Sequence, residues 1–116
     1  MSRRGVCQRP HRILLALLAL LVSSLGCNTF QGALLYRDGT RALDAGDTTA
    51  AISALEEAAL RAPQASEVQN HLGLAYLAAE RRDDALRAFE RAVALDCDNE
   101  AAERNLRVMR APAAQR

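Results

Sequence analysis

The sequence predicts an all-α fold, a short solenoid of stacked helical hairpins, and three observations support this. Apolar residues recur at helical spacing from Val68 to Ala79 and again from Ala85 to Val93, so each stretch has one apolar face. The polar residues 81–84 separate the two stretches. The same pattern stands about 34 residues earlier, where Gly39 takes the place of Gly73. Two hairpins and one further helix therefore account for residues 32–111.

The second hairpin carries the clearest motif. Its marker residues are Leu72, Gly73, Tyr76, Ala85, Phe89 and Ala92. They resemble the tetratricopeptide repeat (TPR), a helix-turn-helix unit of about 34 residues whose copies stack into a solenoid. Cys97 stands where proline commonly follows this repeat. The resemblance implies a TPR-type solenoid of two repeats and a C-terminal capping helix, and a protein that binds other proteins.

The first hairpin is bounded by residues that favour helix ends. We expect its first helix to run from about residue 30 to 45 and to stop at Gly46, because glycine commonly follows a helix C-terminus. Asp47 is the predicted N-cap of the second helix, which continues until Pro63.

The second hairpin begins with a capping box, in which Ser66 is the predicted N-cap and Gln69 reaches back to the backbone. The third helix should end near Glu80. Asp83 is the predicted cap of the fourth helix, which should reach about Leu95.

A fifth helix completes the prediction. Asp98 or Asn99 should cap it, and it should end at residues 111–112, where alanine is followed by proline. Arg107 occupies the place of Gly73 in this helix and is too large to admit a paired helix. The fifth helix is therefore predicted to be the polar cap that a stack of repeats needs for solubility.

Two glycines lie inside predicted helices. Glycine in a helix interior costs about 1 kcal/mol relative to alanine, so Gly39 and Gly73 need a compensating reason. A residue without a Cβ lets the paired helix of the same repeat come close. We therefore expect a helix contact at each glycine, with Tyr76 and Phe89 as the large side chains of the core.

The first 26 residues have the layout of an export signal. Arg3, Arg4, Arg9 and Arg12 precede an unbroken apolar run over 13–22, which is shorter than the roughly 20 residues of a transmembrane helix. Ser24-Leu25-Gly26-Cys27 then resembles the bacterial lipoprotein box. The resemblance implies cleavage before Cys27 and covalent attachment of lipid, with acyl chains such as palmitate, to its sulfur. A plain secretory signal and an uncleaved anchor are the alternatives.

Acylation of Cys27 would place the protein in the bacterial cell envelope. Each buried CH₂ contributes about 0.8 kcal/mol, so two or three acyl chains would hold the domain firmly at the bilayer. Asn28 follows Cys27 where aspartate would favour the inner membrane, so the resemblance implies the outer membrane, with the domain facing the periplasm. The predicted segments are a lipoprotein signal peptide (1–26), a lipidated tether (27–31), repeat 1 (32–65), repeat 2 (66–99), a capping helix (100–111) and a frayed tail (112–116).

Charge and cysteine content limit the classes of function that the sequence allows. The full chain has 15 basic and 14 acidic residues, and removal of four arginines with the signal would leave a net charge of −3, which disfavours nucleic-acid binding. Once Cys7 is removed and Cys27 acylated, Cys97 would have no partner within the chain. It would then either fill a turn as a small residue or form an intermolecular disulfide.

No constellation in the sequence predicts an enzyme. His71 is the single histidine after the signal, which excludes a histidine-rich metal site. The adjacent acidic pairs at 56–57 and 83–84 point apart around a helix and are poor candidates for acid-base catalysis. We therefore predict no catalytic residue, no metal and no cofactor other than the lipid on Cys27.

The resemblance to TPR proteins also predicts a binding surface. In that family the first helices of the repeats line a groove that takes peptides or partner helices. Transfer by register gives the candidates Tyr36, Thr40, Leu43, Asp44, Glu67, Asn70, Leu74, Leu77, Ala78, Arg104 and Val108. Leu43, Leu74 and Leu77 would either form an apolar strip for the partner or bury against neighbouring helices. The chain has no lysine, so the family's clamp for C-terminal carboxylates is excluded.

These features predict a non-enzymatic, membrane-anchored adaptor that binds an envelope protein or peptide. Similar TPR lipoproteins assist assembly of pili, secretion complexes or outer-membrane proteins. The alternative is a structural homo-oligomer, formed by stacking of repeats between molecules without a dedicated peptide ligand.

Overall fold

The structure is a computed structural model that describes residues 26–111. This part of the chain contains five α-helices: α1 (Gly26–Asp44), α2 (Thr48–Arg61), α3 (Ser66–Ala78), α4 (Arg82–Leu95) and α5 (Glu100–Arg110). The predicted signal sequence up to residue 25 and the predicted frayed tail lie outside the described residues. Within residues 26–111, no helix combines the length and hydropathy that a membrane span requires.

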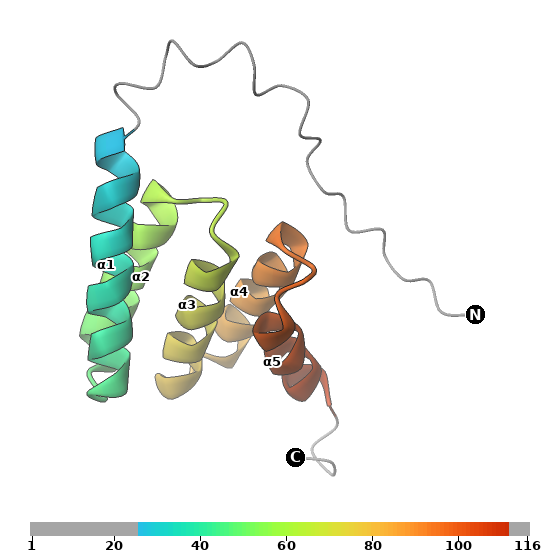
Figure 1. Ribbon diagram of the computed structural model, residues 1–116. Coiled ribbons are helices and arrows are strands. Elements are labelled where there is room, and N and C mark those ends of the chain that lie inside the picture. Colours follow the sequence, from blue (N-terminus) through green and yellow to red (C-terminus); the bar gives the residue numbers. More distant parts are fainter. Residues whose placement is uncertain (1–25, 112–116) are drawn as a thin grey trace, which may run out of the picture.

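The helices form two antiparallel hairpins and a cap. α1 pairs with α2 and α3 with α4, while α2 packs on α3 and α4 on α5 (Figure 1). The first helices also contact one another, α1 with α3 and α3 with α5, whereas the described parts of α2 and α4 do not meet. The two sets of helices thus form two layers, with α1, α3 and α5 in front in Figure 1. This arrangement confirms the predicted all-α solenoid.

Two of the predicted helix caps are confirmed. The Asp47 carboxylate accepts a hydrogen bond from the Ala50 backbone N–H at 3.0 Å, at the start of α2. The Asn99 side chain accepts one from the Ala102 N–H, also at 3.0 Å, at the start of α5. Both bonds are local, since they join residues three apart, and each satisfies a backbone donor that the first turn leaves without a partner.

The other two predicted caps are wrong. α3 begins at Ser66 itself with Ala65 at the N-cap, and α4 begins at Arg82 with Arg81 at the N-cap, in both cases without a side-chain cap. The Ser66 hydroxyl is buried and donates instead to the Ala92 carbonyl at 3.0 Å. A tertiary contact between α3 and α4 thus replaces the local bond, and Asp83 falls within the first turn of α4.

α1 starts earlier than predicted. It begins at Gly26 rather than near residue 30, so residues 27–31, expected to be a tether, are helical. The early turns of α1 are supported by α2: the Arg61 guanidinium donates to the Gln31 side chain at 2.6 Å. At Gly32, an added Cβ would lie 3.3 Å from the Arg61 Cβ. These contacts hold α1 against α2 at residues 31 and 32, directly after the additional turn.

The core consists of two clusters in successive layers. The first holds Ala51, Leu55, Leu72 and Ala75, and the second holds Ala85, Phe89 and Leu106. Tyr76 packs against both, and Phe89 is fully buried. The close helix contacts expected at the two glycines are confirmed. A Cβ added at Gly39 would lie 2.7 Å from Leu55 Cγ, and one at Gly73 would lie 2.5 Å from Phe89 Cε1.

The two turns within the hairpins have the same geometry. Gly46 has φ +79° and Glu80, one period later, has φ +60°. In each turn the next N–H bonds back over five residues, from Asp47 to the Ala42 carbonyl and from Arg81 to the Tyr76 carbonyl. This is the Schellman arrangement, which requires a left-handed residue after the helix. Gly46 meets that requirement as predicted, whereas the second hairpin places glutamate there.

Cys97 lies half-buried in the connection between α4 and α5 and is disulfide-bonded. The expectation that Cys97 has no partner within the chain concerned the processed protein, without Cys7 and with an acylated Cys27, and it stays a prediction. The side chains of Cys7 and Cys27 lie outside the described residues.

Candidate functional site

One set of polar contacts recurs along the first helices. The Tyr36 hydroxyl lies 3.1 Å from His71 Nδ1, and the two rings meet edge to face with centroids 5.2 Å apart, which joins α1 to α3. One repeat later, the Asn105 side-chain amide donates to the Asn70 carbonyl oxygen at 2.8 Å, which joins α3 to α5. Both pairs are 35 residues apart. The same two register positions therefore link each first helix to the next.

A second set of recurring contacts joins each second helix to the first helix that follows it. The Tyr76 hydroxyl donates to Glu56 at 2.6 Å, between α3 and α2. The Arg110 guanidinium donates to Glu90 at 2.7 Å, between α5 and α4. Each glutamate lies 20 residues before its partner. A glutamate on each second helix thus fixes the following first helix.

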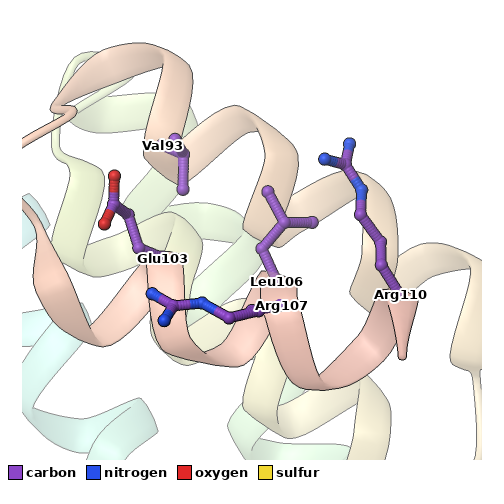
Figure 2. A pocket seen from close by; sticks show the side chains of 5 residues that line it. All are labelled: Val93, Glu103, Leu106, Arg107 and Arg110. Atoms are coloured by element: carbon purple, nitrogen blue, oxygen red, sulfur yellow. The ribbon is translucent and has the colours of Figure 1, made fainter. Parts of the chain in front are cut away.

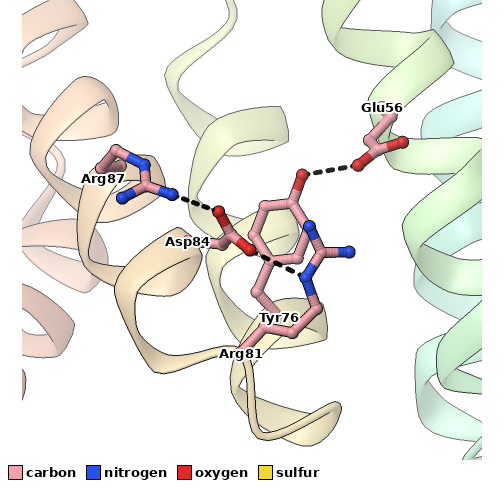
Figure 3. A network of polar contacts seen from close by, with 5 residues as sticks. All are labelled: Glu56, Tyr76, Arg81, Asp84 and Arg87. Carbon is pink, nitrogen blue, oxygen red and sulfur yellow. Dashed lines mark hydrogen bonds and ion pairs between the residues drawn. The ribbon is translucent and has the colours of Figure 1, made fainter.

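Tyr76 is the centre of the polar network in Figure 3. The Arg81 guanidinium lies over its ring, 4.5 Å from the centroid, and donates to Asp84 at 2.8 Å. Arg87 donates to the other oxygen of Asp84. Burial, and then the hydrogen bond to Glu56, raise the pKa of Tyr76 to about 12. The hydrogen bond from Arg81 lowers the pKa of Asp84. These groups hold the turn between α3 and α4 against α2, which is a structural role.

The structure divides the predicted groove residues by exposure. Asp44, Glu67, Ala78, Arg104 and Val108 are exposed, whereas Tyr36, Thr40, Leu43, Leu74 and Leu77 are half-buried. Asn70 is only 5% exposed, and it accepts the bond from Asn105, so its amide serves the α3–α5 contact. We call the surface formed by the ten other residues the first-helix face.

The three leucines pack against neighbouring helices, one of the two alternatives that the sequence left open. Leu43 packs against the first core cluster, and Leu74 and Leu77 pack against the second. Each nevertheless keeps part of its side chain exposed. Val108 is the apolar residue that the first-helix face exposes most, at 61%. Val108 is therefore the candidate centre for an apolar contact on α5.

Two hollows that the sequence analysis missed lie at the ends of the solenoid. One, of about 320 Å³, lies between α4 and α5 and is lined by Val93, Glu103, Leu106, Arg107 and Arg110 (Figure 2). The other, of about 290 Å³, lies between α1 and α2 and is lined by Gln31, Leu34, Leu35, Asp38, Glu57 and Arg61. The repeat register could have indicated the hollow between α1 and α2. Leu34 stands at the place of the buried Val68 in α3, which packs on the preceding helix α2, but the described residues place no helix before α1.

Within 26–111, no group of three or more histidine, cysteine, aspartate or glutamate residues could hold a metal ion. The adjacent acids of the sequence take part in structural contacts, Glu57 with Arg61 at 2.8 Å and Asp84 with Arg81.

Comparison with known proteins identifies the second repeat. Residues 66–99 match the tetratricopeptide repeat family, the same residues that the sequence analysis assigned to repeat 2. Neither a curated protein nor a solved structure matches the chain. The fold is thus a short TPR-type solenoid, and TPR domains generally act as scaffolds for binding other proteins.

Proposed function

We propose that this protein is a lipid-anchored adaptor of the bacterial envelope that binds another envelope protein along its first-helix face. The setting is assembly of a pilus, a secretion complex or an outer-membrane complex. The binding role and the membrane anchor are supported by separate observations. The TPR-type solenoid supports the protein-binding role, and the lipoprotein box ending at Cys27 supports the envelope anchor.

The observation that carries the binding role is the recurring contact between first helices. Tyr36 meets His71, and Asn70 meets Asn105, so α1, α3 and α5 form one continuous layer. The contacts fix these helices relative to one another, and binding to a pre-organised backbone loses less conformational entropy.

Arg104 is the last member of this series of register positions. It stands one period after Asn70 and two after Tyr36, and each of those residues is bonded to the next first helix. Its described contact is an exposed ion pair with Glu100 on its own helix at 3.2 Å, and such pairs contribute little to stability. A partner that packs beside α5 would meet Arg104 and the exposed Val108. We therefore propose a partner segment with an acidic group next to an apolar residue.

Photo-crosslinking in the native host tests the proposal. A photoreactive amino acid replaces Val108, and the matched control replaces Arg87, which is exposed on α4 in the other layer. We expect one other envelope protein to be captured at Val108 and not at Arg87. With that protein purified, Arg104→Glu should weaken binding roughly tenfold or more, whereas the same charge change in Arg87→Glu should not.

Two other outcomes have distinct meanings. Capture of the same chain at Val108, with a molecular size that rises with concentration, would support the homo-oligomer. Equal capture at both positions would show that the first-helix face is not the binding surface.

A further inference from the structure

One corner of the solenoid differs from the rest of its surface. Because α1 and α2 are antiparallel, the start of α1 and the end of α2 lie at the same edge, which is the upper edge in Figure 1. The bond between Gln31 and Arg61 fixes them there. Phe30 is 66% exposed and Leu60 is 81% exposed, and each is the chain neighbour of one of these bonded residues. Two of the three large hydrophobic residues that the described surface exposes are thus at this corner.

The connection beside this corner is uncharged. Residues 62–65, which join α2 to α3 at the same edge, read Ala-Pro-Gln-Ala, and Pro63 and Gln64 are exposed. We call Phe30, Leu60 and residues 62–65 the anchor corner. Arg61 lies between Leu60 and this connection in the chain, and its guanidinium is paired with Glu57 at 2.8 Å.

The equivalent connection one repeat later is acidic. Residues 96–99 contain the exposed Asp96 and Asp98, and the exposed Glu100 follows at the start of α5. The turns at the opposite edge are charged as well, with Asp47 in the first hairpin and Glu80 and Arg81 in the second. At this corner, Phe30 and Leu60 thus expose apolar surface beside an uncharged connection, with the Arg61–Glu57 ion pair next to it.

We infer that the anchor corner rests in the interfacial region of a phospholipid bilayer. The inference rests on the proposed acylation of Cys27, which lies three residues before Phe30, or about 4.5 Å along α1. A lipid on Cys27 would bring Phe30 and Leu60 to the bilayer surface, where aromatic and aliphatic side chains insert. Anionic headgroups would repel the acidic connection 96–99, so the α4–α5 side would point away from the bilayer.

Tryptophan reporters can test this inference, because the chain contains no tryptophan of its own. Phe30→Trp and Leu60→Trp replace exposed side chains at the corner, and Val108→Trp is the matched control, exposed on α5. Each full chain is produced in a bacterium that processes lipoproteins and is reconstituted into phosphatidylethanolamine–phosphatidylglycerol vesicles with brominated or ordinary acyl chains. Bromine quenches a tryptophan only when the indole is near the acyl region.

We expect the indole fluorescence of the Phe30→Trp and Leu60→Trp variants to be blue-shifted and largely quenched by the brominated vesicles, while the Val108→Trp signal is unchanged. Vesicle flotation is recorded on the same samples, with Cys27→Ser as the variant without an anchor. Flotation with no quenching, or with equal quenching at all three positions, would overturn the inference and leave the anchor intact. Failure of the processed chain to float would remove the anchor and the inference together.

Discussion

Several single residues depart from what their local sequence favours, and tertiary contacts account for some of them. Ser66 favours an N-cap by type, yet its hydroxyl donates to Ala92 and accepts a bond from the Asn99 amide at 2.7 Å. The buried serine thereby joins α3, α4 and the start of α5. Glu80 is different, because its positive φ is imposed by the turn and no contact of its side chain explains the choice of glutamate.

Glu80→Gly should stabilise the protein. The left-handed conformation costs a residue with a Cβ roughly 1–2 kcal/mol, whereas glycine adopts it without that penalty and loses somewhat more chain entropy. The expected rise in the free energy of unfolding is about 0.5–1 kcal/mol, measured by urea denaturation. Gly46→Ala is the reciprocal control, because an added Cβ there meets nothing within 4 Å and only the backbone conformation is strained. A destabilised Glu80→Gly protein would contradict this account of the turn.

Tyr76 should make stability depend on alkaline pH. Its pKa rises from 10.0 to about 12 on folding, first because of burial and then because of the bond to Glu56, so folding favours the protonated phenol. This stabilisation is present in full below pH 10.0 and is lost as the pH rises through about 12. Urea midpoints should fall across that window, and less steeply in Tyr76→Phe. Tyrosinate absorbance is the direct check. Tyr36 is the only other tyrosine, and burial raises its pKa as well, so the variant should keep one raised ionisation and lose the one near pH 12.

At the scale of whole helices, packing depends on the contact between the two helices of a hairpin. Gly73 admits the fully buried Phe89 ring and Gly39 admits Leu55, whereas the exposed Arg107 takes the corresponding register position on α5. The lack of a Cβ at this register position therefore goes with close contact between the two helices of a hairpin. The structure confirms this expectation from the sequence at both glycines.

Gly73→Ala should destabilise the protein even though alanine is the better helix former. The new methyl would lie 2.5 Å from Phe89 Cε1, and overpacking of a filled core typically costs 1–3 kcal/mol, more than the gain of about 1 kcal/mol in helix propensity. A double-mutant cycle with Phe89→Leu isolates the contact. The coupling energy from urea denaturation should be favourable, because the smaller side chain makes room for the methyl. Additive free energies would show that the glycine has another purpose.

The whole molecule is a linear stack in which each helix contacts near neighbours only. Among the described helices, α1 and α5 have no direct contact, and the two core clusters are joined through Tyr76. Two repeats and a cap fall below the three or more repeats that usually give independent stability. Each interface should therefore support the whole stack, so that a change at one end weakens the other.

Leu106→Ala in α5 should lower the stability that is measured at α1. Leu106 is buried in the second cluster, and truncation of a core leucine typically costs 2–5 kcal/mol. In a Tyr76→Phe background, Tyr36 is the only tyrosine and reports on α1 by its fluorescence. The urea midpoint at Tyr36 should fall with Leu106→Ala and stay nearly unchanged with Val108→Ala, which alters an exposed residue of the same helix. An unchanged midpoint at Tyr36 in both variants would mean that the two hairpins unfold independently.

The helices, the repeat period and the contacts at Gly39 and Gly73 were all predictable, because periodicity and residue size act within or between neighbouring helices. The caps at Asp47 and Asn99 were predictable for the same reason, since a cap bond spans three residues. The positions of the candidate groove residues along the chain followed from the register alone.

Whether the side chains of these candidate residues are exposed to a partner did not follow from the register. The burial of Asn70, the use of Ser66 between three helices, the hollows at both ends and the exposure of Phe30 and Leu60 depend on how the hairpins stack. Those contacts join residues 26 to 35 positions apart. A side chain's partner at such a distance depends on the angle and separation of two helices, which no local pattern specifies.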